Sequence, residues 1–530
     1  MNKPRIMVLL LAVAGVLSLG AQNSDDVVRD KMTSAVMKVY DDHLAQNPSD
    51  YNVMFARAHQ HYYNGDYTAA LTDVNQAMLL TPKTDKELRF DEYILRARIS
   101  DARRDYASEL SDLKLAQELQ PKSLACTDLI AKANLKTGNL DAAEKAFKTI
   151  LRAESMNYDA MYGLAQVNLL RGNTKEALNQ VNKAVGLFRT EPQVYVNRAD
   201  IYARQGDISA AVQDLLQGMS VGDGGDAVQT LFDLSDNNYD AVMASLADLA
   251  DRNPAEAGTY RYLRANVAMD HCHYRQALED LYTVQRTKQF KSNNVDYYIA
   301  KCCLELARYD EALDHVKQAI AADATQPEYY LVKSLAEYNA GQGGNIDAAM
   351  EALEHCSRMF PQYVPMLLAK ASLLSRQGRD NEALGYLNAA VANDPNDAEA
   401  LWTRGMLLKR LGNTKLSTRD LNTVALMSDD PHDLKGFAVA ELGRDNDAFN
   451  WLRLLTAAPQ AGGENYYYAA MFMAMRGDNF RAMDFLQKAI DNGFDSVYRL
   501  RDDVLSPVNL APLRSDKSFD LLVDKVLNRR

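Results

Sequence analysis

A repeat with a period near 34 residues constrains this chain more than any other feature of its sequence. Pro48 and Pro82 are 34 residues apart, and between them stands NGDYTAAL, a turn followed by the apolar start of a helix. Similar turns recur at TGNLDAAE (137–144), RGNTKEAL (171–178), QGDISAAV (205–212), ARYDEALD (307–314), QGRDNEAL (377–384), LGNTKLST (411–418), LGRDNDAF (442–449) and RGDNFRAM (476–483). A fixed period of this size is typical of a solenoid, in which each helical hairpin buries its apolar face only against its neighbours.

Length, composition and charge are consistent with such an array. A chain of 530 residues is too long for one hydrophobic core, and its 47% of hydrophobic residues exclude disorder throughout. The formal net charge is -12, and no basic stretch stands out. A nucleic-acid partner would have to bind against this negative field, so we expect none.

Small residues stand at fixed positions around the turns. The first helix of a unit carries one (Ala58, Ala165, Ala199, Ala265, Ala300, Ala371, Gly405), the second helix carries alanine (Ala70, Ala143, Ala177, Ala211, Ala277, Ala312, Ala383), and several units close with proline (Pro82, Pro121, Pro361, Pro395). In these features the chain resembles the tetratricopeptide repeat family. The resemblance implies an all-α fold, a tetratricopeptide-repeat superhelix in which about thirteen antiparallel helix hairpins form an α-solenoid. Short side chains let the backbones of two helices approach closely.

The repeat pattern and its irregularities divide the chain into five parts. We expect a signal peptide (1–21), an N-terminal helix with repeat units 1–5 (22–220), a glycine-rich break with a degenerate sixth unit (221–254), units 7–13 (255–494) and a C-terminal capping segment (495–530). GMSVGDGGD (218–226) favours a hinge at the break, because glycine-rich stretches are flexible. A terminal unit must cover an otherwise open apolar face, which accounts for the capping segment.

The first residues have the layout of an export signal. Lys3 and Arg5 precede an apolar run from Ile6 to Leu19, and Ala21 follows among small residues. The run is shorter than the roughly 20 residues that a membrane span needs, which favours a signal cleaved near Ala21. No cysteine ends the run, so we expect no lipid anchor. The expected location is periplasmic or associated with the outer envelope, and a eukaryotic secretory location stays open.

The five cysteines are Cys126, Cys272, Cys302, Cys303 and Cys356. An odd and small number for this length argues against a disulfide framework. Cys302, Cys303 and Cys356 stand in helical patterns, where we expect small buried hydrophobes rather than redox centres.

Arginine and aspartate recur sixteen residues apart across the turns. Arg57 and Asp73 each stand eight residues from Gly65, and the same interval joins Arg96 with Asp112, Arg198 with Asp214, Arg264 with Asp280, and Arg404 with Asp420. Where the arginine is absent the aspartate is absent too, as in Ile130 with Ala146. A catalytic site would occur once, so we expect five structural ion pairs, each within one hairpin.

A partner-binding groove is expected on the inner face of the superhelix, which by the family resemblance is lined mainly by first helices. Its candidate residues are Phe55, His59, Tyr62, Tyr162, Tyr262, Tyr297, Lys301, Trp402 and Tyr467. Aromatic side chains supply large contact area at little entropic cost. Packing between adjacent hairpins explains the same aromatics equally well.

No catalytic residue, cofactor site or metal site is expected. His271, Cys272 and His273 fall at a turn, and residues two apart on a helix do not face together. None of the usual nucleophile, zinc-protease, phosphate-loop or dinucleotide patterns appears in a strand-to-helix context.

The sequence therefore favours a non-enzymatic scaffold or adaptor that binds partner proteins or peptides in an exported compartment. The alternative is a binding protein for an extended ligand, such as unfolded peptide or secreted polysaccharide, serving as a chaperone or export accessory. An enzyme is the third possibility, and no motif supports it.

Overall fold

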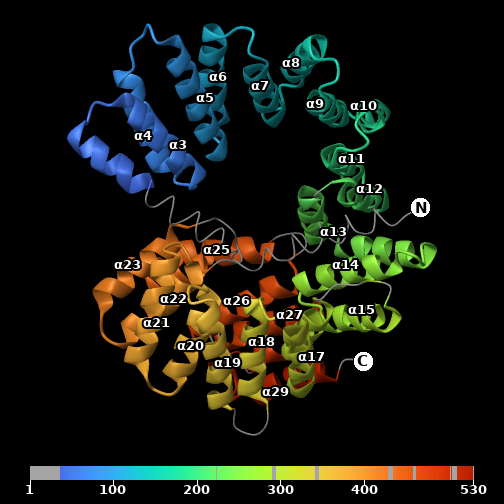
Figure 1. Cartoon of the computed structure of the whole chain (residues 1–530), viewed down its shortest axis with the longest axis vertical. Helices are drawn as coiled ribbons and strands as arrows, with labels where there is room; N and C mark the ends of the chain where they lie inside the picture. The colour runs from blue at the N-terminus through green and yellow to red at the C-terminus, as the bar shows by residue number, and fades with distance from the viewer. Residues whose placement is uncertain are drawn as a thin grey trace. The chain divides into compact units, whose positions relative to one another are not determined.

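The computed structural model describes residues 36–222, 224–288, 290, 294–340, 345–427, 434–457, 461–501, 503 and 510–528 (Figure 1). The expected signal peptide lies outside the described residues. Residues 36–46 are helical. They are followed by α3 (Tyr51–Tyr63), α4 (Tyr67–Leu80), α5 (Lys86–Ala102), α6 (Tyr106–Leu119), α7 (Leu124–Lys136), α8 (Leu140–Ala153), α9 (Tyr158–Leu170), α10 (Thr174–Leu187), α11 (Pro192–Arg204), α12 (Ile208–Val221) and α13 (Gly225–Arg252).

The second half of the chain continues with helices only, and no strand occurs in the described residues. These helices are α14 (Ala257–Asp270), α15 (Tyr274–Thr287), α16 (Val295–Glu305), α17 (Tyr309–Ala322), α18 (Pro327–Asn339), α19 (Ile346–Met359), α20 (Val364–Arg376), α21 (Asp380–Asn393), α22 (Ala398–Arg410), α23 (Thr414–Ala425), α24 (Lys435–Glu441), α25 (Asp445–Ala457), α26 (Gly463–Met475), α27 (Asn479–Asp491), α28 (Val497–Arg501), the 3-10 helix η2 (Ala511–Leu513) and α29 (Lys517–Leu527).

The described chain forms two compact units that divide between Leu231 and Phe232. Unit 1 pairs α3 with α4 and continues in this way to α11 with α12, and unit 2 pairs α14 with α15 and so on to α26 with α27. The division falls inside α13. Later in the same helix, Asn238 leaves helical geometry (φ -141°, ψ 35°). The expected hinge at 218–226 overlaps the end of α12, which runs through Gly218 to Val221, and the start of α13 at Gly225.

Most hairpins turn through a residue with positive φ, and several begin their second helix with a side-chain cap. In the first hairpin Gly65 has φ +77°, and the side chain of Asp66 accepts a hydrogen bond from the Ala69 amide at 2.9 Å. Glycine suits this left-handed conformation because it has no Cβ. Cys272 occupies the turn before α15 with φ +58°, a conformation that costs a residue other than glycine some strain.

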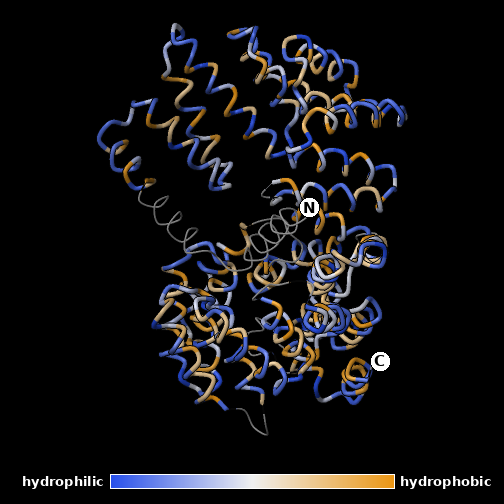
Figure 2. The backbone as a smooth tube through the Cα atoms, turned by 45° about the vertical axis from the view of Figure 1, so that its right-hand side comes forward, coloured by the Kyte–Doolittle hydropathy of each residue, from blue (hydrophilic) through white to orange (hydrophobic). Residues whose placement is uncertain are grey.

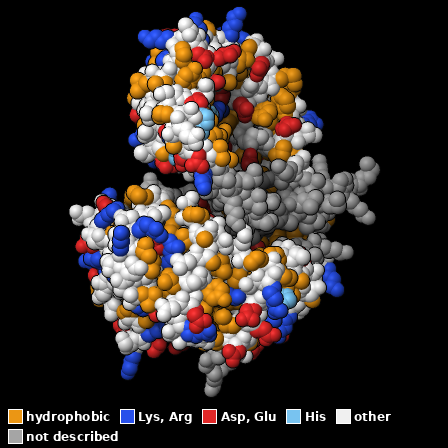
Figure 3. Space-filling view, turned by 60° about the vertical axis from the view of Figure 1, so that its left-hand side comes forward, with side chains coloured by type: hydrophobic (Ala, Val, Ile, Leu, Met, Phe, Trp, Pro, Cys, Tyr) orange, Lys and Arg blue, Asp and Glu red, His pale blue; other side chains and the backbone are white. Residues whose placement is uncertain are grey.

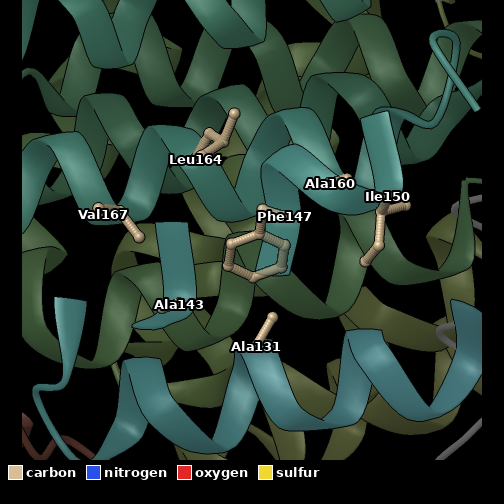
Figure 4. Close-up of a cluster of buried hydrophobic side chains, with 7 residues drawn as sticks. All are labelled: Ala131, Ala143, Phe147, Ile150, Ala160, Leu164 and Val167. Carbon is tan, nitrogen blue, oxygen red and sulfur yellow. The ribbon is translucent and has the colours of Figure 1, made fainter. Parts of the chain in front are cut away.

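Hydrophobic and hydrophilic residues alternate along the helices (Figure 2). Buried apolar side chains form clusters between neighbouring hairpins. One core cluster joins α7, α8 and α9: the ring of Phe147 lies among Ala131, Ala143, Ile150, Ala160, Leu164 and Val167, all buried (Figure 4). Dense packing of this kind is what lets each hairpin stabilise the next.

Consecutive first helices lie on the inner side of each array. In unit 1 the helix α9 contacts both α7 and α11, and in unit 2 the helix α18 contacts both α16 and α20. Among the described elements no two consecutive second helices make contacts of comparable extent. Elements on the inside of a bend approach one another most closely, so the inner faces belong to the first helices.

The C-terminal segment does more than cover the last hairpin. Its helix α29 and the turn η2 pack on α27, as a cap would. In addition, α28 contacts α16, near the beginning of unit 2. The segment expected to be a cap, 495–530, thus contacts both the last helix pair of unit 2 and its beginning.

Candidate functional site

The structure brings both members of all five arginine–aspartate pairs into contact, each through two parallel hydrogen bonds. In the first pair, Nε of Arg57 donates to Oδ2 of Asp73 at 2.7 Å and Nη2 donates to Oδ1 at 2.8 Å. The other four pairs have the same geometry. The aspartates are buried, and the arginines are partly exposed except for Arg404, which is buried as well. Each pair joins the two helices of one hairpin, which makes it a structural element.

Four of these arginines also reach the helix before their own hairpin, a contact that the sequence analysis missed. Nη1 of Arg198 donates to Oδ1 of Asn182 at 2.8 Å. Arg96 bonds Asn75, Arg404 bonds Asn388, and Arg57 bonds Asp41 in the same way. For three of the four the acceptor stands sixteen residues before the arginine, and that interval was the available signal. The arginines therefore fix neighbouring hairpins as well as the two helices of one hairpin.

Three of the predicted groove residues prove to be core residues. Trp402 is 0% exposed, Tyr262 is 1% exposed and Tyr467 is 2% exposed. The ring of Trp402 packs edge-on against Phe437 on α24, at 6.0 Å between ring centres. A side chain without accessible surface offers nothing to a partner, so their assignment to the groove is corrected. The packing explanation applies to these three.

The predicted residues of the first hairpin remain half-buried on α3. Phe55 packs edge-on against His59 with ring centres 4.8 Å apart, and Tyr62 lies 5.9 Å from Tyr67. Burial lowers the pKa of His59, and the positive charge of Arg98 lowers it further. This shift of the pKa favours the uncharged form of His59, although the charged side chains of Arg98 and Asp91 lie near it.

The remaining predicted residues are half-buried, and internal contacts engage two of them. The hydroxyl of Tyr162 donates to Oδ2 of Asp200 at 2.8 Å. The ring of Tyr297 packs against Tyr329 with centres 4.8 Å apart. Lys301 on α16 is also half-buried. Phe55, His59, Tyr62 and Tyr162 of the predicted set belong to unit 1, and the other predicted residues belong to unit 2.

A hollow of about 380 Å³ opens on the inner face of unit 1 and is the candidate partner-binding surface. It is lined only by first helices: Lys132, Leu135 and Lys136 of α7, Gln166, Leu169 and Leu170 of α9, and Arg204 of α11. Leu170 is 58% exposed. We call these seven residues the α7–α11 hollow. None of them was predicted, although Gln166 and Leu170 lie one and two turns beyond the predicted Tyr162.

The charged rim of the α7–α11 hollow is already balanced. Lys132 pairs with Asp128 at 2.7 Å and Arg204 with Asp200 at 2.8 Å, and Lys136 pairs with Asp101. An incoming acid would have to compete with these carboxylates. Contact with a partner would therefore be favourable mainly through the burial of the leucine side chains of the hollow.

A second hollow, of about 370 Å³, lies between α4, α5 and α6. Its lining is mostly polar and includes Arg96 and Asp112, which form one of the structural ion pairs. Hydrophobic side chains are interspersed with charged and polar ones over the face shown in Figure 3. Single exposed hydrophobic residues are normal and need no partner.

His271 lies beside two carboxylates that the sequence analysis did not connect with it. One potential ligand atom from each of Asp236, Asp270 and His271 lies within 4.8 Å of the others. Ser235 and Asp236 approach the same atom, Nε2 of His271, at 3.0 and 3.8 Å. A hydrolytic triad needs the acid on the other ring nitrogen, and Ser235 is fully buried, so this is not a catalytic triad. Exposed acidic groups are common without a metal, and we assign none here.

All five cysteines are buried and free. Burial raises the pKa of Cys126 and of Cys356 to about 11, and that of Cys303 to about 12. A thiol that is not ionised at neutral pH is a poor nucleophile, which agrees with a packing role. None of the described helices is long and apolar enough to cross a membrane.

Comparison with known families matches the hairpins themselves. Three family models described as tetratricopeptide repeat match residues 129–192, 192–221 and 342–407. A tetratricopeptide repeat and J domain-containing co-chaperone of Fusarium oxysporum is 36% identical over 83 residues, which make up 14% of this chain and 16% of the co-chaperone. Most of that relative therefore has no counterpart in the alignment.

Solved structures of other proteins are similar at low identity. Naa15/Naa10 bound to HypK-THB is 14% identical, with 95% of this chain and 92% of that chain covered and a TM-score of 0.31. YrrB, a TPR protein with an unusual peptide-binding site, is 13% identical, with 34% and 91% covered and a TM-score of 0.26. Likenesses at these scores do not bear on what this chain binds.

Proposed function

For this all-α solenoid of tetratricopeptide repeats, we propose the function of a non-enzymatic scaffold that binds partner proteins in an exported compartment. The α7–α11 hollow is the proposed binding surface. The single observation that carries this proposal is that the half-buried Leu135 and Leu169 and the exposed Leu170 line a hollow formed by three consecutive first helices.

The hollow fits an apolar side chain presented by a protein segment. Complete burial of one leucine-sized side chain is worth about 1.5–3 kcal/mol, enough to anchor a peptide when several polar contacts accompany it. Because Lys132, Lys136 and Arg204 are already paired with acids, we expect apolar contacts to contribute more to the binding of a partner than charged contacts do. Arg198 of α11 bonds Asp214 in its own hairpin and Asn182 in the preceding hairpin. These bonds hold α11 against the preceding hairpin before a partner binds.

A protein partner is favoured over a polysaccharide. Sugar rings stack on exposed aromatic faces, and Tyr262, Trp402 and Tyr467 have no exposed face to offer. The α7–α11 hollow contains no aromatic residue at all. Its leucines suit a hydrophobic side chain of a folded or an extended protein segment.

Export rests on the layout of the N-terminus, with Lys3 and Arg5 before the apolar run 6–19. Determination of the N-terminus of the mature protein, together with fractionation of the cells, tests this part. A mature chain that begins near Ala21 in the exported fraction is expected. A chain that retains residues 1–21 in the cytoplasm would contradict it.

The binding surface is tested by one substitution and a matched control. Leu170→Glu places a charge in the α7–α11 hollow, whereas Leu79→Glu places the same charge on an 85% exposed position of α4, a second helix of the same unit. Partners captured from the native envelope by cross-linking should be lost with Leu170→Glu and kept with Leu79→Glu. Both variants should keep the melting temperature of the unmodified protein. Equal capture by the two variants would contradict the assignment.

A further inference from the structure

A segment near the C-terminus is seated on the inner part of unit 2. Residues 493–501 follow α27 and include the short helix α28. From Phe494 to Tyr498, and again at Leu500, these residues are buried. Their contacts are with the α14–α16 region and with α26, so the segment joins the first hairpins of unit 2 to the last. We call residues 493–501 the C-terminal latch.

The acidic end of the latch caps a helix that starts more than two hundred residues earlier. The carboxylate of Asp495 accepts hydrogen bonds from the amide of Tyr274 at 2.7 Å and from that of Arg275 at 3.0 Å. In return the amide of Asp495 donates to the carbonyl oxygen of Cys272 at 3.2 Å. A helix N-terminus stabilises a carboxylate through its free amides and its dipole.

The carboxylate of Asp495 supplies the cap that the turn before α15 lacks. In several hairpins the side chain of the residue before the second helix is the cap, as Asp66 is for α4 and Asp478 for α27, whereas α8, α10, α17 and α21 have no such side-chain cap. At α15 that position is His273, whose side chain makes no capping hydrogen bond. The turn before α15 thus presents an anion site that the latch fills.

The basic end of the latch occupies an aromatic and acidic pocket. The guanidinium of Arg499 pairs with Glu464 at 2.6 Å and lies 4.7 Å above the ring of Tyr467. The hydroxyl of Tyr467 donates to the carbonyl oxygen of Arg499 at 3.0 Å. Between the two ends, the hydroxyl of Ser496 donates to Glu305. The surface therefore recognises a carboxylate and, four residues later, an arginine.

The fit between the latch and this surface is close. The ring of Phe494 stacks on Tyr467 with centres 4.5 Å apart and planes at 11°. A methyl group added to Gly493, whose φ is +95°, would lie 1.9 Å from Nε2 of His273, so only glycine fits there. A methyl group on Gly463 of α26 would lie 2.7 Å from the amide nitrogen of Phe494. Shape and charge both match this one segment.

We propose that the surface beneath the latch is a second peptide-binding site, which the chain's own residues 493–501 keep closed. Its ligand is a partner segment in which an aromatic residue precedes an acid and an arginine follows four residues later. The site lies in unit 2 and uses none of the residues of the α7–α11 hollow, so its test is independent of the test of the proposed function.

The tether explains why such a site is normally closed. A segment held by a short linker acts at an effective concentration in the millimolar range, so a free peptide of equal intrinsic affinity competes poorly. Weakening the two charged contacts of the latch removes this advantage. A peptide that carries the intact sequence should then take its place.

The test uses the full-length chain with Asp495→Ala and Arg499→Ala together, and a fluorescent peptide of sequence GFDSVYRLR, which is residues 493–501. The peptide should bind this variant at least tenfold more tightly than it binds the unmodified chain. A peptide with the same two residues replaced by alanine should bind neither. As a matched control, Asp478→Ala removes a helix cap that is local to α27, and it should create no peptide binding.

Buried Cys272 reports on the same event without a ligand, because its carbonyl and thiol both contact the latch. Alkylation of Cys272 should be at least tenfold faster in the double variant, and the peptide should slow it again. Cys126, buried in unit 1, should react at an unchanged rate. Unchanged alkylation of Cys272, or its acceleration without peptide binding, would overturn the proposal.

Should the double variant fail to fold, the unmodified chain still gives an answer through hydrogen exchange. The amides of Tyr274 and Arg275 are held by Asp495, so release of the latch exposes them while the rest of α15 stays folded. Their exchange should depend less on urea than that of amides in the middle of α15. An identical urea dependence would mean that the latch opens only when unit 2 unfolds, and the proposal would be wrong.

Discussion

The ring of Phe147 on α8 lies so close to Gly163 on α9 that a methyl group added to the glycine would sit 2.2 Å from the ring carbon Cζ. The neighbouring small residues Ala131 and Ala143 border the same ring (Figure 4). The absence of one side chain at position 163 is therefore what lets the two hairpins meet. Small residues at such positions therefore contribute to packing by leaving space for a large side chain of the neighbouring hairpin.

This contact predicts that Gly163→Ala destabilises the protein. Alanine favours a helix over glycine, but forcing a methyl group into a packed core costs about 1–3 kcal/mol. Gly385, in the middle of α21, has no atom within 4 Å of an added methyl group. Gly385→Ala should therefore stabilise by about 0.5–1 kcal/mol. Urea unfolding followed by circular dichroism measures both, and equal signs would contradict the packing argument.

The ion pairs predict a non-additive mutant cycle. Asp280→Ala leaves Arg264 without its two-bond acceptor in a largely buried site, so the loss should be about 1–3 kcal/mol. Adding Arg264→Leu imitates the natural combination of Ile130 with Ala146 and should recover much of that loss. Urea unfolding of both single variants and the double variant gives the coupling energy. Additive effects would show that the pair contributes nothing as a pair.

The burial of Trp402 predicts a loss of stability from Trp402→Ala. Removing a large core aromatic leaves a cavity and costs about 3–5 kcal/mol. Tyr63 of α3, which is 71% exposed, is the matched control, and Tyr63→Ala should change the free energy of unfolding by less than about 0.5 kcal/mol. Thermal and urea unfolding distinguish the two, and a Trp402→Ala variant as stable as the unmodified protein would contradict the packing role of Trp402.

Glu109 predicts a dependence of stability on pH. Burial, and then the negative charge of Asp101, raise the pKa of its carboxyl to about 7, and its Oε2 atom has no hydrogen-bond partner among the described residues. The folded state thus holds a proton that the unfolded chain releases near pH 4.5, so this carboxyl costs stability increasingly as pH rises from 4.5 to 7.

Glu109→Gln should therefore raise the free energy of unfolding at pH 8 by about 1–3 kcal/mol, and the gain should shrink towards pH 5. Exposed Glu118 on the same helix provides the control, since Glu118→Gln should have little effect at either pH. Urea unfolding at pH 5 and pH 8 makes the comparison. A gain that does not vary with pH would show that the charge of Glu109 is not its cause.

Much of the fold could be predicted from the sequence because the decisive contacts are local. The partners Arg57 and Asp73 are sixteen residues apart, and the turn at Gly65 lies midway between them. Any hairpin that closes at that glycine must bring the two side chains together. The period of the turns likewise predicted the all-α solenoid, since each hairpin packs on the next in the chain.

The candidate sites depended on the tertiary structure. The sequence placed Tyr162 and Trp402 at equivalent positions of two repeats, yet one is half-buried and the other fully buried. The α7–α11 hollow forms where residues of three consecutive first helices come together. The sequence of a single repeat therefore cannot reveal it. Asp495 contacts the start of α15 because each hairpin of unit 2 is rotated slightly relative to the one before. The sum of these rotations brings the last residues of unit 2 close to its first hairpins. A repeat pattern specifies how each hairpin meets its neighbour, whereas the sum of those rotations decides which distant residues touch.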